Sequence, residues 1–123
     1  MQGMAHRILV IDDAADIALT LRMLLERAGH EVITAENGRR GLRCFYETRP
    51  DLVMLDVRMP ELDGWQTLER LRDLSDVPVL MVSGTTPTAE QLERLRPGRD
   101  AFEAKPLWGD HLIEVVGELL TAA

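Results

Sequence analysis

The sequence predicts an α/β fold in which a doubly wound, five-stranded parallel sheet lies between layers of helices. Short runs of aliphatic and β-branched residues alternate along the chain with longer amphipathic stretches, a pattern typical of successive strand–helix units. The run Leu52–Asp56 begins with four consecutive apolar residues, as expected of a strand buried on both faces. A length of 123 residues suits one domain, and we expect residues 1–123 to form it.

Five segments are expected to be strands. Gly29 and Pro50 lie shortly before the second and third of them, where a helix must end and the chain must turn. The expected strands are Arg7–Ile11, Glu31–Ala35, Leu52–Asp56, Val79–Val82 and Ala101–Ala104.

Five helices are expected to alternate with these strands. Leu21 and Leu25 recur at helical spacing in the first, Phe45 and Tyr46 could face the sheet from the second, and Leu74 continues the apolar stripe of the third. The expected ranges are Ala15–Ala28, Arg39–Glu47, Trp65–Leu74 and Thr88–Arg96, followed by a last helix with Leu112, Val115, Val116 and Leu119 at its apolar positions.

The fourth of these helices has the weakest pattern. Only Leu92 and Leu95 form an apolar stripe, and Pro97-Gly98 stops the helix. We expect it to be the most mobile element, because it has little apolar surface to bury.

The composition excludes several classes of protein. A formal net charge of −7 argues against direct binding of nucleic acid, which requires a basic patch. One cysteine, Cys44, permits no internal disulfide and fits a reducing compartment. The longest apolar runs, such as Val79–Val82, are too short to span a membrane, and no apolar stretch of signal-peptide length precedes the first strand. We therefore expect a cytoplasmic protein that does not associate with membranes.

Charged residues stand at the end of, or directly after, three of the expected strands. Asp12-Asp13, Asp56 and Lys105-Pro106 each come directly after or at the end of such a run. Parallel strands bring these ends to one edge of the sheet, which is where ligands bind in this class of fold. Three carboxylates repel one another there unless a cation intervenes, and Mg²⁺ prefers oxygen ligands. A cation with a lysine is suited to holding a phosphoryl group.

Two further features support this interpretation. Ser83 ends the fourth strand with a hydroxyl that can donate to a phosphoryl oxygen, and the small Gly84 beside it leaves room for an incoming group. Proline is the residue before which a cis peptide bond is cheap, and a cis Lys105-Pro106 bond would direct Lys105 into the site.

Each of these features alone has an ordinary structural explanation. Asp12 or Asp13 could cap the helix that follows, and Asp56 could simply occupy a turn after its strand. Ser83-Gly84 and Lys105-Pro106 are also common in turns. Their occurrence at the ends of successive strands is what makes the combination specific.

With these residues in place, the chain resembles a receiver domain of two-component response regulators over nearly its whole length. The resemblance implies a flavodoxin-like three-layer sandwich with strand order 2-1-3-4-5. Gly84 stands where alanine is frequent in that family, and Leu62 where methionine is frequent. The residues that carry the resemblance are Ile8-Leu9-Val10-Ile11-Asp12-Asp13, Leu55-Asp56-Val57-Arg58-Met59-Pro60 with Asp63-Gly64, Val82-Ser83-Gly84, and Phe102-Glu103-Ala104-Lys105-Pro106.

The resemblance implies a role for each site residue. Asp56 corresponds to the phosphoacceptor, Asp13 to a direct Mg²⁺ ligand, and Asp12 to a ligand that acts through water. The backbone carbonyl of Arg58 occupies the remaining protein-ligand position, and Mn²⁺ is an alternative ion.

The same resemblance assigns the residues of a switch. Ser83 corresponds to the hydroxyl that senses the phosphoryl group, Lys105 to the lysine that pairs with it, and Phe102 to the switch aromatic. Gly84 and the side chain of Arg58 are expected to control access to the site.

The implied function is signalling by phosphorylation. A histidine kinase or phosphotransfer protein would donate the phosphoryl group, docking near the start of the first helix. Ala14, Ala15 and Ile17 are the candidates for this contact, although the helical spacing of Ile17 with Leu21 favours a place in the core. The face formed by the fourth helix, fifth strand and fifth helix would then meet an effector domain or a second copy. Such a domain catalyses only its own phosphorylation and dephosphorylation, and it occurs alone or within a longer regulator or hybrid kinase.

Three other functions remain as alternatives. A pseudo-receiver would bind partners without taking phosphate, but the complete set of acids, Ser83 and Lys105 argues against it. A small-molecule aspartyl phosphatase would carry two aspartates separated by one residue after the first strand, whereas Asp12 and Asp13 are adjacent. A flavin-binding protein would need a phosphate loop rich in Ser, Thr and Gly in place of this acidic one.

Overall fold

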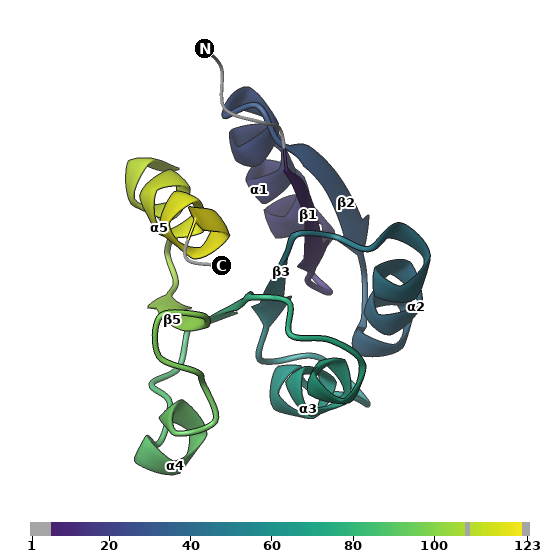
Figure 1. The fold of residues 1–123 in the computed structure, drawn as a ribbon, viewed down its shortest axis with the longest axis vertical. Coiled ribbons are helices and arrows are strands. Elements are labelled where there is room, and N and C mark those ends of the chain that lie inside the picture. The colour runs from purple at the N-terminus through teal and green to yellow at the C-terminus, as the bar shows by residue number, and fades with distance from the viewer. Residues whose placement is uncertain (1–5, 108, 122–123) are drawn as a thin grey trace.

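The computed structural model describes residues 6–107 and 109–121, and they form a five-stranded sheet with helices on both faces (Figure 1). All strand pairs are parallel, and the order is β2-β1-β3-β4-β5, so the sequence-based prediction of the fold is confirmed. The strands agree with the expected ranges, except that β4 extends one residue further. They are β1 (Arg7–Ile11), β2 (Glu31–Ala35), β3 (Leu52–Asp56), β4 (Val79–Ser83) and β5 (Ala101–Ala104).

The helices pack in two layers. Ile8 and Val10 of β1 belong to the core cluster shared with α1 and α5, whereas Leu9 and Ile11 belong to the cluster shared with α2 and α3. This alternation is the two-residue period of a strand buried on both faces. The helices are α1 (Ala15–Arg27), α2 (Gly38–Thr48), α3 (Gly64–Leu74), α4 (Ala89–Leu92) and α5 (Gly109–Thr121).

The fourth helix is much shorter than the sequence predicts. α4 ends at Leu92 instead of Arg96, and none of its residues is buried. The physical reason lies at Arg96, whose backbone N–H and guanidinium both donate to the carboxylate of Asp100, at 3.0 and 3.1 Å. These bonds hold the segment after α4 against the start of β4 and β5, where a continued helix could not place it. Gly98 then turns the chain with a φ of +75°, which glycine adopts without strain.

Two helix side chains expected to face the interior point outward. Tyr46 is 67% exposed and Leu74 is 54% exposed, so both expectations are wrong. In α2 the inward positions belong to Gly41 and Phe45, and a Cβ at Gly41 would collide with the side chain of Ile11. With Gly41 and Phe45 facing the sheet, the 100° turn per helical residue directs Tyr46 away from it. Tyr46 lies beneath the guanidinium of Arg49, 5.3 Å from the ring centre.

The described helices are all short by the standard of the lipid bilayer. None of them has the length and apolar content that crossing a membrane requires.

Candidate functional site

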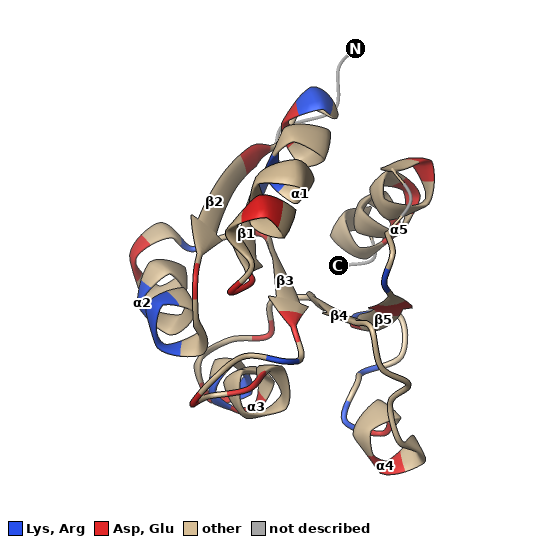
Figure 2. Cartoon of the chain, turned by 180° about the vertical axis from the view of Figure 1, so that it is seen from behind, with Lys and Arg blue, Asp and Glu red and all other residues tan. Residues whose placement is uncertain are grey.

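Polar residues lie at the carboxyl ends of β1, β3, β4 and β5, on one edge of the sheet. Figure 2 shows acidic positions, in red, at the ends of β1 and β3. The parallel register pairs Asp56 with Val82 of β4, so Ser83 lies one position beyond it. Asp12 and Lys105 directly follow β1 and β5. The sheet topology thus brings together residues up to 93 positions apart in the sequence.

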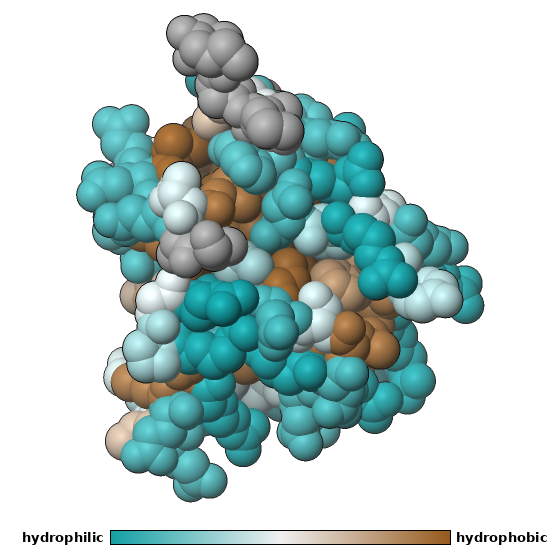
Figure 3. Space-filling model, in the orientation of Figure 1, coloured by the Kyte–Doolittle hydropathy of each residue, from teal (hydrophilic) through white to brown (hydrophobic). Residues whose placement is uncertain are grey.

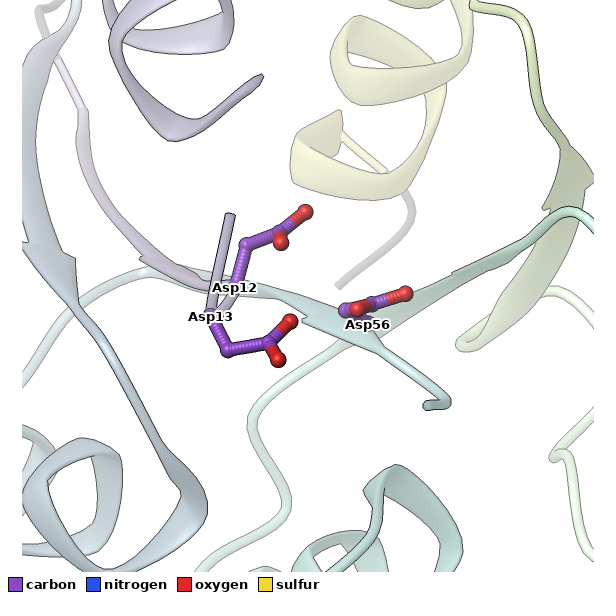
Figure 4. Close-up of side chains that lie close together, drawn as sticks. All are labelled: Asp12, Asp13 and Asp56. Carbon is purple, nitrogen blue, oxygen red and sulfur yellow. The ribbon is translucent and has the colours of Figure 1, made fainter. Parts of the chain in front are cut away.

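Three carboxylates converge at this edge (Figure 4). Asp12, Asp13 and Asp56 each offer an oxygen, and these oxygens all lie within 4.8 Å of one another. Asp12 and Asp56 are 3% and 7% exposed, whereas Asp13 is open to solvent. Several carboxylate oxygens at such spacing, with one open side for water, fit a hard divalent cation that keeps part of its hydration.

The simpler explanation of Asp12 and Asp13 as helix caps does not hold. The N-cap of α1 is Ala14, which makes no side-chain cap. Asp12 instead accepts a hydrogen bond at 2.9 Å from the backbone N–H of Ala14 through one oxygen, which leaves the other turned to the site. Both acids therefore remain free to serve as ligands.

Lys105 is the cation that faces these acids among the described residues. Its Nζ lies 3.3 Å from Oδ1 of Asp56 and 3.5 Å from Oδ2 of Asp12. Burial raises the pKa of the Asp56 carboxyl, the charge of Asp12 raises it further, and Lys105 opposes both effects without cancelling them. The cluster is therefore short of positive charge, which a bound cation would supply.

The loop after β3 is held close to Asp56 by local structure. The Asp63 carboxylate caps α3 by accepting from the backbone N–H of Gln66 at 2.9 Å. The side-chain oxygen of Gln66 in turn accepts from the backbone N–H of Asp63 at 3.0 Å. A Cβ at Gly64 would collide with the backbone carbonyl oxygen of Asp56, so only glycine permits this approach. The Asp63-Gly64 pair thus fixes how α3 begins beside the site.

A groove opens from the site toward α3 and α4. It has a volume of about 520 Å³ and receives the exposed side chain of Arg58, along with Asp13, Trp65 and Thr85. Gly84 is exposed beside it, and a Cβ there would meet no atom within 4 Å. Of the two residues expected to control access, Arg58 lines this groove, and Gly84 adjoins Thr85, which also lines it.

The expected switch residues lie on neighbouring strands. Ser83 is buried, with 1% of its surface exposed, and its hydroxyl contacts Thr85. Phe102 of β5 is half-buried and stacks on Trp65, with ring centres 6.4 Å apart and planes 6° from parallel. The peptide bond between Lys105 and Pro106 is cis, as the sequence suggested.

A sequence model of the response regulator receiver domain matches residues 8–117 of the chain, which include every site residue described above. The chain belongs to the response regulator receiver domains. The resemblance on which the sequence-based interpretation relied is thereby confirmed.

Curated relatives of this receiver fall into two lengths. "Chemotaxis protein CheY" of Bacillus subtilis is 33% identical over 119 residues, which cover 95% of this chain and 99% of that protein. "Probable transcriptional regulator ycf27" of Pyropia yezoensis is 41% identical over 106 residues, or 86% of this chain and 44% of that protein. The receiver therefore spans less than half the length of the ycf27 relatives.

Solved structures agree with this assignment. The chemotaxis protein CheY4 of Vibrio cholerae superposes with a TM-score of 0.86 at 27% identity, covering 94% of this chain and 99% of that one. The receiver domain of a signal transduction histidine kinase from Syntrophus aciditrophicus gives a TM-score of 0.84 at 33% identity, covering 97% of this chain and 92% of that one.

Two features of the receiver escaped the sequence-based interpretation. Thr85 binds the hydroxyl of Ser83, and its position two residues further on is the spacing of a hydroxyl turn, which could have pointed to it. Asp100 is completely buried between Arg72 and Arg96 at the opposite end of the sheet. The spacing of four residues between Arg96 and Asp100 could have pointed to their pairing, but no sequence signal joins Arg72, 28 positions away, to Asp100.

Proposed function

We propose that this receiver, residues 1–123, takes a phosphoryl group onto Asp56 from a phosphohistidine and transmits the change to a partner. The observation that carries the proposal is the buried Asp56 carboxylate, within reach of two other acids and 3.3 Å from Lys105. No substrate-enclosing domain is needed for this reaction, and the receiver would catalyse only its own phosphorylation and dephosphorylation.

The metal ligands of this proposal are Asp13, Asp56 and the backbone carbonyl of Arg58, with Asp12 acting through a water molecule. Mg²⁺ is the expected ion and Mn²⁺ an alternative, because both accept oxygen ligands. When bound, the ion neutralises the carboxylates and the charge on the phosphoryl oxygens.

The chain's own residues would carry out the transfer. An oxygen of Asp56 attacks the phosphorus, and the new P–O bond forms as the P–N bond to the histidine breaks and the imidazole nitrogen keeps the bonding electrons. Lys105 holds a phosphoryl oxygen by its charge, and the hydroxyl of Ser83 donates to another. Catalysis is then mainly positioning and electrostatic stabilisation.

We assign to Arg58 and Gly84 the control of access to the phosphorylated Asp56. Arg58 lies exposed at the mouth of the groove, where its side chain can limit the approach of a hydrolytic water to the acyl phosphate. The half-life of the phosphorylated protein should therefore change in an Arg58→Ala variant. An unchanged half-life would refute this role.

The proposed signal is a rearrangement of the face formed by α4, β5 and α5. Movement of Ser83 toward the phosphoryl group would draw in the β4–α4 loop and let Phe102 turn. α4 offers little resistance, since none of its residues is buried. Amide NMR spectra recorded with and without a phosphoryl mimic test this, because shifts confined to the vicinity of Asp56 would contradict it.

The partner that donates phosphate is proposed to dock between α1 and the β5–α5 loop. An apolar groove of about 480 Å³ lies there beside Lys105. Figure 3 shows the other edge of the sheet, where apolar side chains lie between α1 and α5. The groove beside Lys105 suits a histidine kinase or phosphotransfer protein working in the cytoplasm. The α4–β5–α5 face would meet an effector domain or a second copy. The lining of the groove includes Ile17, Thr20, Leu24, Pro106 and Leu107.

The test is chemical labelling at Asp56. The protein is incubated with Mg²⁺ and a small phosphodonor such as acetyl phosphate, and intact-mass spectrometry should find one added phosphoryl group. The adduct should disappear in Asp56→Asn and with a chelator, but persist in Asp76→Asn, which changes an 87% exposed acid. Failure of the wild-type protein to take phosphate would favour a pseudo-receiver that only binds partners.

A further inference from the structure

The hydroxyl of Ser83 is already engaged in the structure. Its oxygen accepts a hydrogen bond at 3.0 Å from the backbone N–H of Thr85 and lies 2.9 Å from the hydroxyl oxygen of Thr85. Among the described residues, the hydrogen bonds of the Ser83 side chain all go to Thr85, two positions along the chain. Ser83 is 1% exposed, so water does not compete for this contact.

This contact competes with the role proposed for Ser83. A serine hydroxyl carries a single proton and therefore donates to one acceptor at a time. With Ser83 as the donor in the contact between the two hydroxyls, its proton must turn away from Thr85 before it can reach a phosphoryl oxygen on Asp56, which pairs with Val82 on the next strand. The contact between the hydroxyls then has to break before the active arrangement forms.

Thr85 is placed so that it can release Ser83 at little further cost. Thr85 is exposed, and it lines the groove that runs from Asp13 past Arg58. After release, water can form a hydrogen bond with the Thr85 hydroxyl at once. Releasing Ser83 therefore costs little beyond the loss of the Ser83–Thr85 contact itself.

We propose that Thr85 is a positioning residue that holds the Ser83 hydroxyl in the resting arrangement and thereby sets how readily the receiver switches. The proposal rests on the proposed function, because it assumes a phosphoryl group on Asp56. Among the described residues, Thr85 makes no hydrogen bond to the acids or to Lys105, and its side chain bonds to Ser83.

The test measures binding of beryllium fluoride, a non-covalent mimic of a phosphoryl group on a carboxylate, in the presence of Mg²⁺. Thr85→Val removes the hydroxyl but keeps the size and the backbone N–H, and it should bind the mimic about two- to tenfold more tightly, the effect of one hydrogen bond. Thr85→Ser restores the hydroxyl and should bind as the wild type does. Thr86→Val alters the neighbouring exposed threonine and should have no effect.

Two readouts separate this role from a general disturbance of the loop. The affinity for Mg²⁺ without the mimic should be the same in Thr85→Val and wild type, because Thr85 makes no hydrogen bond to the carboxylates. In a Ser83→Ala background, Thr85→Val should no longer change binding of the mimic, because the partner of the contact is gone.

Each result bears on a different statement. Unchanged or weaker binding of the mimic by Thr85→Val, with normal binding by the wild type, would overturn the role of Thr85 and leave the proposed function standing. Equal tightening in Thr86→Val or in the Ser83→Ala background would also overturn it. If the wild type bound no mimic and formed no adduct on Asp56, the proposed function would fail and the role of Thr85 with it.

Discussion

The two ends of this sheet each bury an aspartate beside positive charge, and they balance that charge in opposite ways. At the carboxyl end, Asp56 shares one lysine with Asp12 and lies beside a third acid, Asp13, and the pKa of Asp56 is raised. At the other end, Asp100 pairs with two arginines, Arg72 and Arg96, and accepts a further bond at 3.0 Å from the backbone N–H of Val79.

The chemistry of Asp100 shows how a buried acid is stabilised. Burial alone would raise the pKa of Asp100, but hydrogen bonds from Arg96, from Arg72 and from Val79 outweigh burial and lower the pKa below its usual value. The same residue type is thus satisfied at one end and left short of positive charge at the other. A buried acid that the fold leaves unsatisfied is the one available for chemistry.

The largest expected effect is on stability at the satisfied end. Asp100→Asn leaves two arginines facing a neutral group, and we expect a loss of roughly 3 kcal/mol in the free energy of unfolding, measured by denaturant titration. Asp76→Asn changes the exposed partner of the same Arg96 and should cost less than about 0.5 kcal/mol. Equal losses of stability in the two variants would show that the buried Asp100 contributes no more to folding than the exposed Asp76 does.

The lowered pKa of Asp100 predicts that the stability of the fold depends on pH in acid. Because the pKa of Asp100 is lowered from 3.8, its contribution to stability is fully present above about pH 4 and is lost as pH falls through the lower, folded-state value. Acid titrations of unfolding free energy should therefore be flatter below pH 4 in Asp100→Asn than in wild type. Parallel curves would contradict this assignment.

Mg²⁺ should stabilise the protein by binding at the end of the sheet that lacks positive charge. A tenfold excess of Mg²⁺ over its dissociation constant should raise the free energy of unfolding by about 1.4 kcal/mol. Asp13→Asn should abolish this gain, while Asp100→Asn, although less stable, should keep it in full. A loss of the Mg²⁺ effect in Asp100→Asn would mean that the two ends are not independent.

In the metal-free protein, removing charge from the unsatisfied end should stabilise the fold. Because the pKa of Asp56 is raised, its charged form is disfavoured in the folded protein relative to the unfolded chain at neutral pH. Asp56→Asn should therefore increase the free energy of unfolding, by about 1 kcal/mol, the size of a typical single-substitution effect. Lys105 retains Asp12 as a partner at 3.5 Å, so the variant does not leave a lone buried cation. Thermal unfolding in a chelator is the measurement, and destabilisation would contradict the prediction.

The smallest expected effect is the coupling between the ends. A double variant carrying Asp56→Asn and Asp100→Asn should differ from the sum of the two single changes by less than about 0.5 kcal/mol. A larger difference, measured by the same denaturant titrations, would reveal energetic communication along β5 in the absence of phosphate.

Much of this architecture was predictable because it follows local rules. Apolar runs such as Leu52–Asp56 identify buried strands, and parallel topology then places Asp12, Asp56 and Lys105 at a common edge. The length of α4 was not predictable, because it is fixed by the bond from Arg96 to Asp100, a residue that reads as part of an ordinary turn. Arg96 lies only four positions before Asp100, but Asp100 is itself fixed by Arg72, 28 positions away, and such long-range pairing leaves no periodic signal in a sequence.

The outward positions of Tyr46 and Leu74 have a related cause. A helical stripe identifies several apolar residues as candidates for burial, but the distance between helix and sheet decides how many fit. At α2 that distance is set by Gly41 against Ile11, a contact between two elements that no single segment reveals. The contact between Ser83 and Thr85 was local enough to predict, and only the common use of Ser-Gly in turns obscured it.

The brevity of β5 has a mechanical consequence. Its four residues span about 13 Å, and the strand is flanked by Asp100 at one end and Lys105 at the other. Sliding the strand lengthwise would pull the Asp100 carboxylate away from its arginines at a cost of roughly 3 kcal/mol, whereas turning Phe102 off Trp65 costs only a ring stack, about 1 kcal/mol. We therefore expect a pull on Lys105 to be relieved by rotation of the Phe102 side chain while the backbone of β5 stays in place.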